Sequence, residues 1–145
     1  MHLMRRSTVF LVALCCLACF DSSGPTTVFA SYSLQDINGR PLPTYFTSGG
    51  GLTIVSGGLT LNSNGSAAIT QVQQLNNTLS TYTSHYKYTL DNGAITFEAT
   101  DPCPADAICI GPPTGTIHGN SVSVTIVPVT VDGPIVYNFT HFGPD

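Results

Sequence analysis

The sequence predicts an all-β protein, an antiparallel meander of eight to nine strands that closes into a small barrel and occupies residues 28–145. Strand and turn signals alternate along this region, and no segment shows the 3.6-residue hydrophobic period of a helix. Charged residues make up only 8% of the chain while 42% of residues are hydrophobic, so Thr, Ser, Asn and Gly supply most of the polar surface. These are residues of solvated strand faces and tight turns. A length of 145 residues suits a single domain.

Glycine, asparagine and proline delimit the first strands. Apolar side chains alternate along residues 28–34, which favours a strand with one buried face, and Asn38-Gly39 ends it. We expect two short strands over residues 52–56 and 59–61, joined by a tight turn at Gly57-Gly58.

Turns that contain asparagine separate the middle strands. Asn64-Gly65 predicts a hairpin turn, because both residues tolerate the positive φ that twisted hairpins need. A strand over residues 67–75 follows, and Asn76-Asn77 predicts the turn after it. The clearest strand comes next. Along residues 82–90 an aromatic face alternates with a face of Thr, His and Lys.

The last strands follow the same alternation. Asp91-Asn92-Gly93 turns the chain into a strand over residues 94–99, and further strands are expected over residues 115–118, 121–127 and 135–141. Such strands must bury their apolar faces against one another, and closing into a barrel also removes exposed strand edges. A sandwich of two sheets is the competing solution.

The charge distribution excludes two classes of function. All eight acids lie after residue 19, whereas Arg40 and Lys87 are the only bases there, so this part carries two positive and eight negative charges, a net −6. Binding to nucleic acid needs several Lys or Arg contacts to phosphates, which two bases cannot supply. Peripheral attachment to anionic lipid through a basic patch is excluded for the same reason.

Residues 1–18 have the layout of a secretory signal peptide. Arg5 and Arg6 form a positive segment, and the apolar run after them is too short to span a bilayer as a helix. The end of this segment, Leu17-Ala18-Cys19, resembles the lipobox of bacterial lipoprotein signals. The resemblance implies a diacylglyceryl group and an amide-linked acyl chain such as palmitate on Cys19, with residues 19–27 as a flexible tether. Cleavage without lipidation, which gives a soluble secreted protein, is the alternative.

A second resemblance rests on three segments: Tyr32-x-Leu34-x-x-Ile37-Asn-Gly-x-Pro41-Leu-Pro43, Gly58-Leu-Thr-Leu-Asn-x-Asn-Gly65 and Gly115-x-Ile-x-Gly-Asn-x-Val-x-Val124. They cover most of the chain after residue 19, which resembles the small bacterial lipocalin-like lipoproteins. The resemblance implies a barrel in the cell envelope, attached to the membrane by its lipid, that binds a small hydrophobic or amphipathic ligand. Under the sorting rules of diderm lipoproteins, Phe20 beside the cysteine favours the outer membrane.

Two cysteines, Cys103 and Cys109, remain in the predicted domain. In an exported chain, two cysteines this close in sequence predict a disulfide that closes a small, proline-rich loop. A metal site is the alternative, but the spacing matches no zinc pattern and no histidine lies nearby in the sequence.

Aromatic side chains are the candidate ligand-binding residues. Several share the apolar faces of their strands, and tyrosine offers a ligand both an apolar ring and a polar hydroxyl. Filling of the core is the competing role for them, because a barrel of eight strands is just wide enough either to be filled by side chains or to hold one small ligand. The candidates are Tyr32, Tyr82, Tyr86, Tyr88, Tyr137 and Phe139.

No motif predicts an enzyme, a cofactor or a metal site. His85, His118 and His141 are too far apart in sequence to form a ligand pair within one strand, and we expect them on the surface. No serine lies in a nucleophile elbow, and the glycines at 49–51 lack the lysine and helix of a phosphate-binding loop. The sequence therefore leaves two hypotheses, a ligand-binding lipoprotein and a non-enzymatic structural or protein-interaction lipoprotein with a solid core. It identifies no protein partner.

Overall fold

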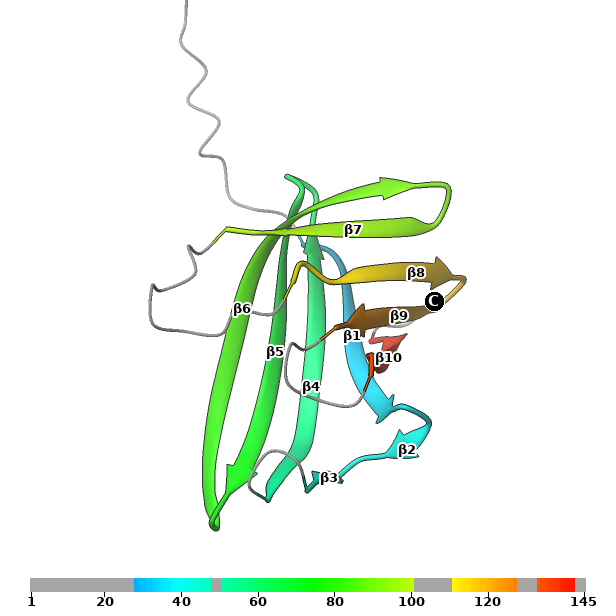
Figure 1. Cartoon of the computed structure of the whole chain (residues 1–145). Helices are drawn as coiled ribbons and strands as arrows, with labels where there is room; N and C mark the ends of the chain where they lie inside the picture. The colour runs from blue at the N-terminus through cyan, green and yellow to red at the C-terminus, as the bar shows by residue number, and fades with distance from the viewer. Residues whose placement is uncertain (1–27, 48–50, 101–110, 128–132, 143–145) are drawn as a thin grey trace, which may run out of the picture.

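The computed structural model describes residues 28–47, 51–100, 111–127 and 133–142, and its regular elements are all strands (Figure 1). Eight of them form a closed antiparallel barrel, in which each strand pairs with the next and β1 pairs with both β4 and β10. The strands are β1 (Val28–Ile37), β2 (Arg40–Pro41), β3 (Thr44–Phe46), β4 (Leu52–Asn62), β5 (Ser66–Leu75), β6 (Thr78–Asp91), β7 (Ala94–Ala99), β8 (Thr114–His118), β9 (Ser121–Ile126) and β10 (Ile135–His141). The short strands β2 and β3 are additions beside β1 and β4. The predicted barrel is confirmed, and its closure through β1 replaces the alternative of a sandwich.

Tight turns form where asparagine and glycine predict them. Asn38-Gly39 has φ angles of 54° and 73°, Asn76-Asn77 has 50° and 63°, and Asn92-Gly93 has 49° and 84°. Two successive residues with positive φ make the type I′ turn, whose twist matches that of the strands it joins. These turns connect β1 to β2, β5 to β6 and β6 to β7.

The alternating apolar positions of the strands face the barrel interior and form one core. Phe97 of β7 and Phe139 of β10 are almost completely buried there. Strands β1, β4 and β9 contribute aliphatic side chains, as their alternation predicts. The buried apolar residues are Ala30, Tyr32, Leu34, Ile37, Ile54, Leu59, Leu61, Ala67, Ile69, Ile95, Phe97, Val122, Val124, Ile126, Tyr137 and Phe139.

The prediction of a turn at Gly57-Gly58 is wrong, because β4 runs through both glycines without interruption. Gly57 serves close packing instead. A Cβ atom at this position would lie 2.9 Å from the backbone oxygen of Thr70 and 3.0 Å from Cδ2 of Leu34. A glycine within a strand often marks such a close approach rather than a turn.

The barrel wall is higher on one side than on the other. Strand β6 has 14 residues and pairs with β5 over most of its length, whereas β9 and β10 have only six and seven residues. One edge of β6 pairs with β5, and on the other edge residues Tyr86–Asp91 pair with β7. Before His85, no described strand pairs with that other edge. In Figure 1 the long strands β4, β5 and β6 extend well beyond the short ones at this end. We call this end of the barrel, which the short strands do not complete, the open end.

Candidate ligand-binding site

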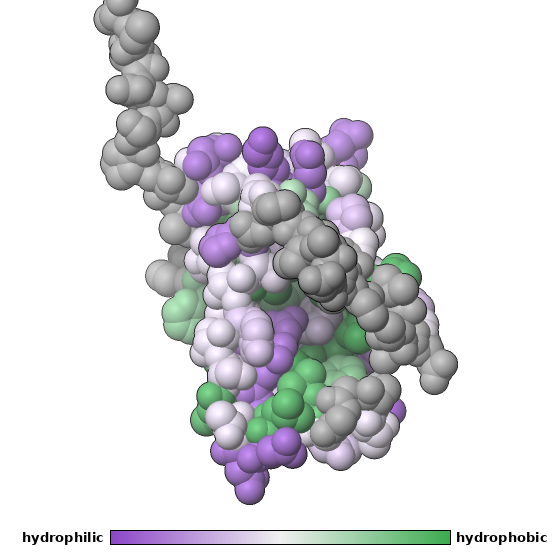
Figure 2. Space-filling model, turned by 60° about the vertical axis from the view of Figure 1, so that its left-hand side comes forward, coloured by the Kyte–Doolittle hydropathy of each residue, from purple (hydrophilic) through white to green (hydrophobic). Residues whose placement is uncertain are grey.

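A cavity of about 300 Å³ lies inside the barrel at its open end. Strands β5 and β6 form one side, and β9 and β10 form the other. Its volume is at the lower end of the range for small-molecule sites. Figure 2 shows a hollowed face on which hydrophobic and hydrophilic side chains adjoin. We call this space the barrel cavity; it is lined by Ile69, Gln71, Gln73, Tyr82, Ser84, Tyr86, Ile126, Ile135 and Tyr137.

The barrel cavity combines apolar walls with polar but uncharged groups. Three isoleucines supply the apolar surface, and two glutamines, three tyrosines and one serine supply hydrogen-bonding groups. None of these described lining residues has a formal charge at neutral pH. The lining therefore suits a ligand part that is itself largely apolar and carries few polar atoms.

A small polar network connects the two sides of the barrel cavity. The side-chain nitrogen Nε2 of Gln73 donates a hydrogen bond of 2.9 Å to Oε1 of Gln71. Burial raises the pKa of the Tyr137 hydroxyl, a hydrogen bond with the Gln71 side chain opposes this rise, and the nearby Tyr86 adds to it. Tyr137 therefore keeps its proton at neutral pH and remains a hydrogen-bond donor.

The tyrosines of β6 are held to different degrees. The ring of Tyr86 contacts the ring of Phe97 edge to face, with 5.6 Å between the ring centroids, and this contact anchors Tyr86 against the core. Tyr82 lies nearer the open end and is 59% exposed. An inward-facing aromatic side chain with so much exposure reflects the missing wall opposite this part of β6.

Of the six predicted ligand-binding residues, the structure brings Tyr82, Tyr86 and Tyr137 together in the lining of the barrel cavity. The other three are not among its lining residues. Tyr32 and Phe139 belong to the core. The hydroxyl of Tyr88 donates a 2.9 Å hydrogen bond to the backbone oxygen of Asn62, which fixes this ring between β6 and β4.

Sequence reasoning missed the two glutamines and Ser84. Their signal was present in the alternation, because Gln71 and Gln73 share the inward face of β5 with the buried Ile69. Ser84 pairs with Ile69 across the two strands and so faces the same interior. Inward positions occupied by polar residues at one end of a barrel are the pattern that would have located the site.

The histidines lie apart from the barrel cavity. His85 is on β6, His118 ends β8, and His141 ends β10, where its ring lies 5.5 Å from that of Tyr32 in an edge-to-face contact. Within the part of the chain that the structure describes, no three His, Cys, Asp or Glu side chains are grouped as metal ligands would be. Nor does that part contain a helix capable of spanning a membrane. The predictions for Cys19 and for the Cys103–Cys109 disulfide concern residues outside the described ranges.

Comparisons with protein-family models, with curated proteins and with solved structures found no match for this chain. The functional interpretation therefore depends on the geometry of the barrel cavity and on the sequence.

Proposed function

We propose that the barrel binds a small hydrophobic or amphipathic molecule in the barrel cavity. The observation that supports this function most directly is the pair of inward-facing amides, Gln71 and Gln73. Both side chains are half-buried on the inward face of β5, where a residue that only fills the core would be apolar, because burying an amide costs free energy unless its polar atoms are paired. The amides bond each other and leave further donor and acceptor positions for a ligand.

Each part of the cavity has a defined role in this proposal. Ile69, Ile126 and Ile135 contact the apolar part of the ligand. The hydroxyls of Tyr86 and Tyr137 and the amides of β5 receive its polar atoms. The ligand enters from the open end, past the exposed Tyr82.

A bulky residue placed in the cavity tests this function. Ser84→Trp points an indole into the barrel cavity, whereas Thr81→Trp places the same group on the outer face of the same strand. The probe is N-phenylnaphthylamine, an uncharged dye that fluoresces in apolar surroundings. We expect the S84W variant to weaken dye binding at least about tenfold, equivalent to roughly 1.4 kcal/mol, and T81W to leave it unchanged.

Equal binding by the two variants would contradict a site inside the barrel. An absence of dye binding by the unmodified protein would favour the other hypothesis, a lipoprotein that acts through its Thr- and Ser-rich outer surface. Far-ultraviolet circular dichroism of both variants checks that they retain the fold.

We further propose that the protein is a cell-envelope lipoprotein without enzymatic activity, anchored in the outer membrane through Cys19. The lipobox-like Leu17-Ala18-Cys19 and the polar tether after it support this location. Mass spectrometry of the protein extracted from membranes of a diderm bacterium tests it. We expect the mass of an acylated chain that begins at Cys19, and we expect Cys19→Ser to release the protein from the membrane. An unacylated chain in the soluble fraction would instead indicate a secreted protein.

A further inference from the structure

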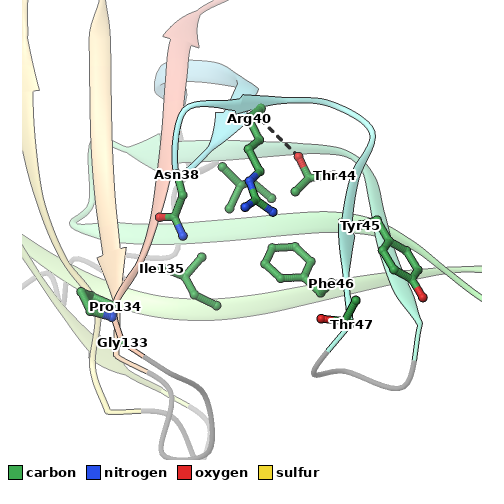
Figure 3. A pocket seen from close by; sticks show the side chains of 10 residues that line it. Asn38, Arg40, Thr44, Tyr45, Phe46, Thr47, Gly133, Pro134 and Ile135 are labelled. Atoms are coloured by element: carbon green, nitrogen blue, oxygen red, sulfur yellow. Dashed lines mark hydrogen bonds between the residues drawn. The ribbon is translucent and has the colours of Figure 1, made fainter.

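A second hollow, of about 340 Å³, adjoins the barrel cavity at the open end. It lies between the β2–β3 segment and the start of β10 (Figure 3). Ile135 lines both spaces, so the two meet at this side chain. We call the second space the side hollow. A molecule bound in the barrel cavity would have to extend past Ile135 to reach the side hollow.

Arg40 gives the side hollow a positive charge. Its side chain extends from β2 into the hollow, toward Phe46 (Figure 3). Arg40 is one of only two bases after residue 19, so half of the positive charge of that part of the chain lies at this point. A guanidinium group offers five N–H donors in a planar fork that matches carboxylate, phosphate and sulfonate groups.

No carboxylate among the described residues forms an ion pair with Arg40. The side hollow has no acidic residue in its described lining. Asp36, four residues earlier, is engaged elsewhere. Its Oδ1 accepts hydrogen bonds from the backbone N–H of Gly39 at 2.9 Å and from Nδ2 of Asn138 at 2.7 Å.

Asn38 adds neutral donors beside the guanidinium. Its Oδ1 accepts a 2.7 Å hydrogen bond from the backbone N–H of Val136. Because a backbone N–H can only donate, the atom that faces it must be the amide oxygen, and the other atom of the Asn38 amide is the nitrogen. Figure 3 shows this nitrogen turned toward the hollow. Thr44 steadies the segment that carries Arg40, because its hydroxyl donates to the backbone oxygens of Arg40 and Pro41 at 3.2 and 3.0 Å.

We infer that the side hollow binds the anionic head group of an amphiphile whose apolar part occupies the barrel cavity. The inference rests on the proposed function and narrows its ligand class to molecules with a carboxylate, phosphate or sulfonate at one end. The uncharged lining of the barrel cavity accepts the apolar part, while Arg40 and Asn38 receive the head group.

Two dyes that differ mainly in one sulfonate test the inference. Anilinonaphthalene sulfonate carries the anionic group, and N-phenylnaphthylamine is its uncharged counterpart. We expect Arg40→Gln to weaken binding of the sulfonate dye about fivefold, the effect of losing one partly exposed charge pair, and to leave the neutral dye unaffected. Arg40→Lys, which keeps the positive charge, should weaken binding of the sulfonate dye less than R40Q does. The control Lys87→Gln removes the other base, on the outer face of β6, and should alter neither dye.

Salt and the cavity-filling variant separate the remaining outcomes. Added salt should weaken binding of the sulfonate dye to the unmodified protein and have little effect with R40Q. Ser84→Trp should weaken both dyes if one ligand spans both spaces. An equal response of the two dyes to R40Q would overturn the inference while the proposed function stands on the neutral dye alone. If R40Q weakens binding of the sulfonate dye but S84W does not, the side hollow is a site for a free small anion. That result would also overturn the inference.

Discussion

Replacing Gly57 with alanine tests how closely the barrel wall is packed. The new Cβ would lie 2.9 Å from a backbone oxygen of β5, which is closer than real Cβ atoms come to other atoms, and 3.0 Å from the Leu34 side chain, which is tighter than most real Cβ contacts. Overpacking of this kind costs about 1–3 kcal/mol. The alanine also restricts the unfolded chain, which stabilises the protein by about 0.4–1 kcal/mol. The two effects leave a net loss of about 0–2.6 kcal/mol, and because the contact at 2.9 Å is with backbone that cannot easily shift, we expect G57A to lower the free energy of unfolding by about 1–2 kcal/mol.

Urea unfolding followed by tyrosine fluorescence measures this change, since the chain contains no tryptophan to dominate the signal. Gly111→Ala is the matched control, because a Cβ at Gly111 meets no atom of the described residues within 4 Å. Only the effect on the unfolded chain remains there, so G111A should be neutral or slightly stabilising. A G57A protein as stable as the original would refute the argument that β4 and β5 require a glycine at this position.

Two further predictions concern ionisable groups. Because burial raises the pKa of Tyr137 above 10.0, the unfolded chain loses this proton first, and stability falls as pH rises above about 10. Tyr137→Phe should make the fall in the free energy of unfolding shallower, by up to about 1.4 kcal/mol per pH unit, in urea unfolding from about pH 9 to about 11. An unchanged slope of that free energy against pH would contradict the raised pKa of Tyr137. Asp36→Ala removes the acceptor for Gly39 and Asn138 and should lower the melting temperature through a loss of about 1–2 kcal/mol; no change would mean that water replaces the carboxylate at no cost.

Much of the barrel could be predicted because its strands obey local rules. The buried faces of β7 and β9 follow directly from the alternation of Ile95 with Phe97 and of Val122 with Val124. The turns at Asn76-Asn77 and Asn92-Gly93 follow from the ease with which these residues adopt positive φ. Each of these features depends on neighbours in the sequence.

Features that depend on distant residues escaped prediction. Gly57 has the local pattern of a turn, and only the approach of Thr70 and Leu34 explains its place inside a strand. The candidate site escaped in part for the same reason. Tyr82 of β6 faces inward, yet its exposure depends on how far β9 and β10 extend beside it, which no local pattern encodes. The position of Arg40 in the side hollow likewise follows from the fold of the β2–β3 segment against β10.

The seam between β1 and β10 has a consequence for how the chain folds. The hydrogen bond from Asn138 to Asp36 joins residues 102 apart, so the first and last of the described strands are neighbours in the finished wall. Closure must wait until residues 135–141 are available, and such non-local pairing is slow. Before then the edges of β1 and β9 are open to other chains. A chain cut short before Ile135 would keep both edges permanently and should assemble edge to edge, so the last seven-residue strand protects the other strands from aggregation.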